Sequence, residues 1–173
     1  SQMVEDDKKM TQVMIDKVFS FGELGFQEFE TSKYLSNILE ENGFELQYNI
    51  SDIPTSWLAK WSNGSGGPVI ALGSDFDGVP STSQYPGVAY EKPVVEGAPG
   101  HGEGHNIGLP IVITAALSIK KVMIENNING TLLLWPGVAE EILGSKAWYV
   151  RDGYFDNVDM CIFTHVSSNM STS

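Results

Sequence analysis

One short segment joins unusual backbone freedom to metal-binding side chains. Residues 100–106 read Gly-His-Gly-Glu-Gly-His-Asn, and a long apolar stretch follows directly over residues 107–124. Glycine allows backbone conformations that other residues avoid and lets the chain approach a ligand closely. Imidazole and carboxylate groups can both bind a divalent cation. A flexible glycine loop before a helix would explain the segment without any function. A phosphate cradle is disfavoured, because Glu103 would place a negative charge where the phosphate should lie.

Apolar residues recur with the spacing of helices in some regions and of strands in others. Helices are expected over residues 10–21, 28–42, 106–126 and 145–151, and strands over 45–50, 56–61, 68–73, 131–135 and 159–164. The central helix is apolar nearly all round, so it should be buried against a sheet. Pro110 is assigned to its first turn, and Pro136 is expected to end a strand. Residues 81–99 are rich in Gly, Pro, Ser and Tyr, which is typical of a long surface excursion. The order of elements predicts an α/β fold with a mixed, mainly parallel sheet flanked by helices.

Acidic and histidine side chains recur where the predicted strands end and where the central helix begins. Each has an ordinary explanation alone, because Asp-rich turns are common and a single histidine is usually structural. In parallel sheets, however, ligands bind beyond the carboxyl ends of the strands. The side chains expected at this edge are Asp75, Asp77, Glu103, His105, Glu140, Glu141 and His165. Their convergence predicts a metal site.

Composition limits the classes of partner. The chain has 22 acidic and 10 basic residues and a net charge of −12, which disfavours nucleic acid and anionic membranes as partners. No apolar run is expected to be long enough to span a bilayer. Cys161 is the single cysteine, so no disulfide within the chain is possible. A cytoplasmic location is expected, with a removed signal peptide left open.

Several segments together resemble a known family. They are residues 21–30, 75–80, 99–106, 136–141 and 149–165. The chain resembles the zinc-type amidohydrolases of the aminoacylase and carboxypeptidase superfamily, in particular the branch that acts on p-aminobenzoyl-glutamate and related N-acyl amino acids. The resemblance implies part of a zinc exopeptidase catalytic domain with a phosphorylase/hydrolase-like fold.

The resemblance also implies a set of metal ligands. His105 and His165 match metal-binding histidines, and Glu141 matches a metal-binding glutamate. Glu103 stands where the family has a metal-binding cysteine. A carboxylate is a harder ligand than a thiolate, so one or two divalent ions, Zn²⁺ or Mn²⁺, are expected, with Mg²⁺ also credible.

Three further acidic residues receive roles from the resemblance. Glu140 matches the general base that activates water, and Asp77 matches an aspartate near the metals; both are assigned to catalysis. Asp75 occupies the position of a metal-binding histidine in the dinuclear peptidases. The implied reaction is hydrolysis of an amide bond in an N-acyl or N-aroyl amino acid or a small dipeptide.

The family pattern extends beyond this chain. Residues 1–173 match the N-terminal portion of the catalytic domain, without the lid and dimerisation domain or the C-terminal part that carries another histidine ligand. The chain alone is therefore expected to be inactive, and the full-length protein to be a homodimer or hetero-oligomer.

Two other functional classes stay open. One is a non-catalytic metal- or ligand-binding domain with an incomplete site. The other is a doubly wound enzyme of different chemistry, for example a nucleotide-binding one, although its glycine loop should directly follow the first strand.

Overall fold

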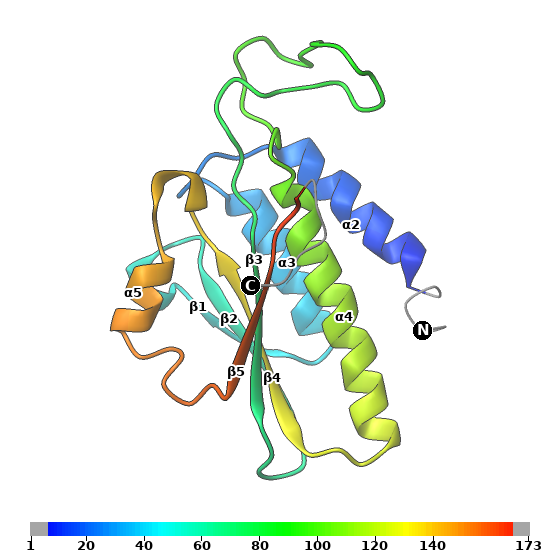
Figure 1. Ribbon diagram of the computed structural model, residues 1–173, viewed down its shortest axis with the longest axis vertical. Helices are drawn as coiled ribbons and strands as arrows, with labels where there is room; N and C mark the ends of the chain where they lie inside the picture. The colour runs from blue at the N-terminus through cyan, green and yellow to red at the C-terminus, as the bar shows by residue number, and fades with distance from the viewer. Residues whose placement is uncertain (1–6, 168–173) are drawn as a thin grey trace.

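A mixed sheet forms the centre of the fold. The computed structural model describes residues 7–167 (Figure 1). Its five strands lie in the order β1-β2-β4-β3-β5. Their bounds are Glu45–Tyr48 (β1), Trp57–Asn63 (β2), Val69–Asp75 (β3), Gly130–Gly137 (β4) and Met160–Thr164 (β5). The pairs β1–β2 and β2–β4 are antiparallel, whereas β3 runs parallel to both β4 and β5. The predicted fold class is confirmed.

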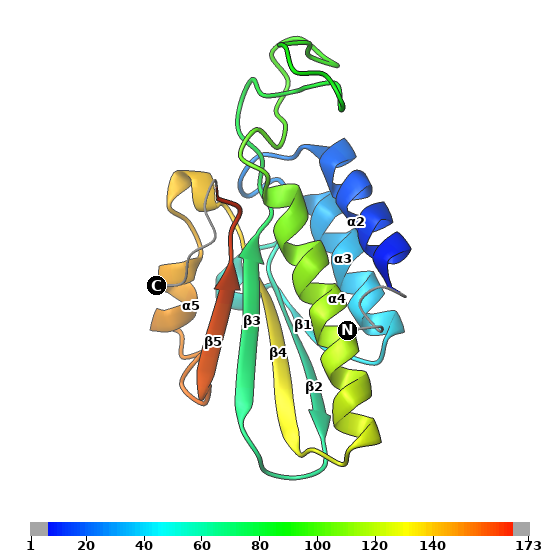
Figure 2. The same ribbon diagram turned by 45° about the vertical axis from the view of Figure 1, so that its right-hand side comes forward.

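Helices cover both faces of this sheet (Figure 2). Helices α2 (Lys8–Phe21), α3 (Phe29–Glu41) and α4 (His105–Glu125) lie on one face, and the short α5 (Lys146–Arg151) lies on the other. Two 3₁₀ turns, η1 (Ile50–Asp52) and η2 (Glu140–Ile142), were not predicted. All four predicted helices are present, and their ends fall within a few residues of the predicted ones.

The long helix α4 is only partly buried. Leu109, Ile113 and Ala116 are fully buried on the side that faces the sheet and α2, whereas Ile111 and Ile119 are exposed. By length and composition alone α4 is apolar enough to cross a membrane, so the expectation that no run is long enough was wrong. Within the most apolar stretch of the helix, 56% is buried inside the fold. Packing against the rest of the protein explains why that buried part is apolar.

Two prolines lie deeper in their elements than expected. Strand β4 continues through Pro136 to Gly137 instead of ending there. Beyond Leu134 its paired residues lie on β3 alone, so the missing N–H of Pro136 is not needed on the β2 side. Helix α4 begins at His105, which places Pro110 in the second turn, where it cannot donate to the carbonyl of Asn106.

The predicted excursion is present. Residues 81–99 contain no helix or strand and extend past the end of the sheet, at the top of Figures 1 and 2. Backbone hydrogen bonds from Ser83 to Ala98 and from Tyr85 to Lys92 hold its two arms together. The excursion returns through Gly100, which pairs with Val79, and leads into α4.

Candidate metal centre

The predicted acidic and histidine residues meet at one edge of the sheet. Asp75 is the last residue of β3, and His165 directly follows β5. Glu140 and Glu141 begin the turn η2 just after β4, and His105 is the first residue of α4. These elements end or begin at the same edge because β3, β4 and β5 run parallel.

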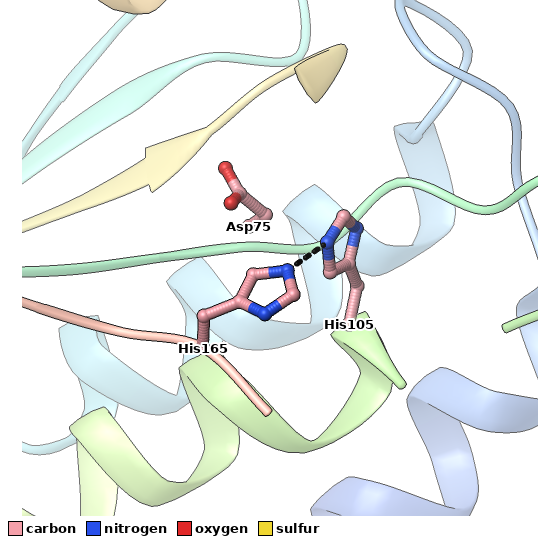
Figure 3. A group of neighbouring side chains, drawn as sticks. All are labelled: Asp75, His105 and His165. Carbon is pink, nitrogen blue, oxygen red and sulfur yellow. Dashed lines mark hydrogen bonds between the residues drawn. The ribbon is translucent and has the colours of Figure 1, made fainter. Parts of the chain in front are cut away.

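Two histidines form the middle of the group. The Nε2 atoms of His105 and His165 are 3.1 Å apart, and their rings are nearly perpendicular (Figure 3). Glu103 reaches both: one carboxylate oxygen is 3.9 Å from Nε2 of His105, and the other is 3.5 Å from Nε2 of His165. Three predicted ligands thus direct donor atoms toward one another.

The donor atoms form two overlapping sets that share His105. Glu103, His105, Glu140 and Glu141 each offer an atom within 4.8 Å of the others. Asp75, His105 and His165 form the second set under the same limit. The structure therefore brings the four predicted ligands together, with His165 joined through His105 and Glu103. Glu140, predicted to be the general base, lies among them.

Asp77 contacts this group on the Nδ1 side of His105. Its carboxylate is almost fully buried. Nδ1 of His105 is 3.1 Å from the backbone oxygen of Asp77 and 3.5 Å from its Oδ1. The backbone N–H of Glu141 donates to Oδ2 of Asp77 at 3.1 Å. Asp77 therefore orients one imidazole and one glutamate, and leaves Nε2 of His105 directed at Glu103 and His165.

The protonation of the group fits a cation site. A hydrogen bond to Glu141 lowers the pKa of Glu103, and the same contact raises the pKa of Glu141 to about 7, because two adjacent carboxylates share one proton. Burial lowers the pKa of His105, but the hydrogen bond and the negative charges of Asp77 and Asp75 raise it overall to about 9. Among the described residues, the buried Oδ1 of Asp77 and Oε1 of Glu141 have only long contacts, at 3.5 and 3.9 Å from Nδ1 of His105, and no well-formed hydrogen bond. A divalent cation would neutralise this excess of negative charge, so the residues fit a metal ion.

Lys146 is a member of the site that the sequence did not reveal. Its ammonium lies 2.9 Å from Oδ1 and 3.1 Å from Oδ2 of Asp75. Burial raises the pKa of Asp75 to about 6, although Lys146 opposes this shift. A side chain at Gly137 would overlap Asp75 Oδ1, so glycine is needed there. Asp75 therefore has a lysine as its cationic partner, whereas Asp77, Glu103 and Glu141 face the imidazole of His105.

The remaining histidine of the glycine loop lies outside the group. Nε2 of His101 is 3.1 Å from the backbone oxygen of Val18, at the end of α2. Burial lowers the pKa of His101 to about 4, so the ring is neutral at pH 7 and Nε2 donates this bond. His101 ties the loop to α2.

The chain is similar to known proteins over most of its length. No family model matches the chain. The chain is 33% identical over 162 residues to one of the subunits of the p-aminobenzoyl-glutamate hydrolase of Escherichia coli, covering 94% of the chain and 33% of that protein. It is 32% identical over 139 residues to the hippurate hydrolase of Campylobacter jejuni, covering 79% and 33%. The chain thus spans about a third of the length of these curated relatives.

The fold is also shared with a solved structure. A Bacillus subtilis protein, described as a dinuclear metal binding peptidase from the M20 family, matches with a TM-score of 0.80 at 24% sequence identity. The match covers 94% of this chain and 44% of the other.

Proposed function

We propose that this chain, which belongs to the metal-dependent amidohydrolases of the aminoacylase and carboxypeptidase superfamily, supplies metal ligands and a general base for amide hydrolysis. The observation behind the proposal is the convergence of Glu103, His105, Glu141 and His165 at one sheet edge. The substrate class is an N-acyl or N-aroyl amino acid or a small dipeptide. Two relatives named for p-aminobenzoyl-glutamate and hippurate, both N-aroyl amino acids, support this class.

The four proposed ligands would hold one or two divalent ions, Zn²⁺ or Mn²⁺. A bound ion lowers the pKa of water and polarises the amide carbonyl. The residues of this chain would hold the metal-binding atoms in position. Asp77 faces Nδ1 of His105, so Nε2, which is directed at His165, is the nitrogen that would bind the ion, and Asp77 also anchors the backbone of Glu141.

Glu140 is the proposed general base. It stands beside Glu141 at the start of η2, directly after Ala139, whose backbone is left-handed with φ 54°. This turn lets adjacent glutamates take different tasks. Glu140 would accept a proton from the attacking water and pass it to the leaving amine.

We place this chemistry in a longer protein. The chain spans about a third of its curated relatives, and one of them is named as a subunit. Assembly as a homodimer or hetero-oligomer is therefore part of the proposal. A cytoplasmic location is proposed from the sequence alone.

The proposal is tested in the full-length protein with a panel of N-acyl and N-aroyl amino acids. Glu140→Gln should lower turnover by at least about 10²-fold while the metal content stays unchanged. Glu141→Gln should lower the metal content itself. Metal binding without hydrolysis of any substrate would favour a non-catalytic binding domain instead. Near-normal turnover of the Glu140→Gln protein would remove Glu140 from the mechanism.

A further inference from the structure

A carboxylate outside the metal group is completely buried beside it. Glu28 stands directly before α3 and has no exposed surface. Its Oε1 accepts a hydrogen bond from the backbone N–H of Ala139 at 2.9 Å, and its Oε2 accepts one from the hydroxyl of Thr55, also at 2.9 Å. Burial raises the pKa of Glu28, but both partners are donors, which favours the ionised form.

The residue that Glu28 binds directly precedes the glutamate pair. Ala139 is buried and has a positive φ of 54°, a conformation that is uncommon for residues other than glycine. Glu140 and Glu141 follow at once in η2. Because a buried N–H without an acceptor is unfavourable, the carboxylate of Glu28 stabilises this turn in the observed conformation.

Residues 23–28, the segment that ends at Glu28, also contact the loop that carries Asp77. The backbone N–H of Gly78 donates to the carbonyl of Glu23 at 2.6 Å, and Leu24 forms a bridge with Gly78. Gly25 lies so close to Ala139 that an added Cβ would be 3.0 Å from it. Residues 23–28 therefore connect the loop after β3 to the loop after β4.

An apolar side chain would fill the same space without the unfavourable burial of a carboxylate. The two donors on Glu28 indicate that hydrogen bonding, rather than packing alone, is its task. We propose that Glu28 is a positioning residue, which acts through the Ala139 turn to hold Glu141 against Asp77 and among the metal ligands. This inference rests on the proposed function, in which Glu141 binds the ion.

The test compares two near-isosteric variants of the chain. Glu28→Met removes both acceptors, whereas the amide oxygen of Glu28→Gln can still accept from Ala139. Glu30→Gln, an exposed position on α3, removes the same charge without touching the site. Two readouts are measured: the affinity for Mn²⁺ by calorimetry, and the backbone amide resonances of Ala139 and Glu141 without metal.

We expect Glu28→Met to weaken Mn²⁺ binding by about tenfold or more, with Glu28→Gln and Glu30→Gln within about threefold of the unsubstituted chain. The Ala139 and Glu141 amide resonances should move in Glu28→Met, although Glu141 does not contact Glu28. An unmoved Glu141 resonance would overturn the inference. Equal loss of affinity in Glu28→Gln and Glu28→Met would also overturn it, because charge rather than the Ala139 bond would then be responsible. If Glu28→Met fails to fold, Glu28→Gln decides alone. A tenfold loss of affinity or a shifted Glu141 resonance in Glu28→Gln overturns the inference, whereas unchanged affinity together with an unmoved resonance supports it.

Failure of the proposed function gives a different result. If the unsubstituted chain binds no divalent ion, the metal function fails, while the metal-free resonances still show whether Glu28 positions the turn.

Discussion

At the scale of single residues, the proposed ligand Glu103 is expected to set which ions the site prefers. Its carboxylate lies near both His105 and His165, at the position where the sequence resemblance implies a metal-binding cysteine. Carboxylate oxygen suits Mn²⁺ and Mg²⁺, whereas thiolate sulfur suits Zn²⁺. The side chain is 44% exposed, so it can adjust to an ion more easily than the buried His105.

Glu103→Cys should therefore shift selectivity from Mn²⁺ toward Zn²⁺. Competition calorimetry on the chain measures the ratio of the two affinities, and we expect this ratio to change by about tenfold or more in favour of Zn²⁺. Glu103→Gln is the control, which should lower the affinity for both ions. An unchanged ratio in Glu103→Cys would show that Glu103 is not a ligand.

Single residues also mark the limit of what the sequence could predict. His105, Glu141 and His165 were placed correctly at the sheet edge because each adjoins a predicted strand or helix. The contacts of Lys146 and Glu28 with residues in or next to the site were missed. Their partners Asp75 and Ala139 are 71 and 111 residues away in the chain, and no periodic pattern encodes such a pairing.

At the scale of elements, helix and strand positions followed from apolar spacing, whereas their contacts did not. The nearly all-round apolar run of α4 predicted a helix buried against the sheet, and α4 does pack on β3, but it did not predict that Ile111 and Ile119 on its other face are exposed. The close approach of α4 to β3 occurs at Gly108, where an added Cβ would lie 1.8 Å from Oγ of Ser74. That hydroxyl donates to the backbone oxygen of Thr164, on β5.

Gly108→Ala should consequently destabilise the chain, although alanine favours helices. Overpacking of this kind reduces the free energy of unfolding by about 1–3 kcal/mol, and the helix preference restores about 1 kcal/mol at most. Urea unfolding monitored by circular dichroism measures the difference. Ser74→Gly in the same chain removes the clashing atoms, so the two changes together should cost less than their sum. A Gly108→Ala chain more stable than the original would refute this packing.

At the scale of the whole molecule, the many acidic groups at one edge link stability to pH. Net charge is −12, and the negative charges of Asp77 and Asp75 face His105. Its ordinary pKa of 6.5 applies in the unfolded chain and the raised value of about 9 in the folded one. The stability that its proton provides is complete below pH 6.5 and is lost as the pH rises through about 9.

We therefore expect the melting temperature of the metal-free chain to fall between pH 7 and about pH 9. Saturating Mn²⁺ should reduce this fall, because metal ligands bind in their deprotonated forms. Differential scanning calorimetry with and without Mn²⁺ checks both statements. His105→Asn should flatten the metal-free profile, and a melting temperature that rises over this range would contradict the assignment.

The proposal that matters most is that Glu103, His105, Glu141 and His165 together bind divalent metal. Anomalous diffraction from crystals of the chain grown with Zn²⁺, recorded at the zinc absorption edge, tests it most directly. We predict a strong anomalous peak about 2.0–2.2 Å from donor atoms of these four side chains. A zinc peak elsewhere on the molecule, with no peak between His105 and His165, would contradict the account.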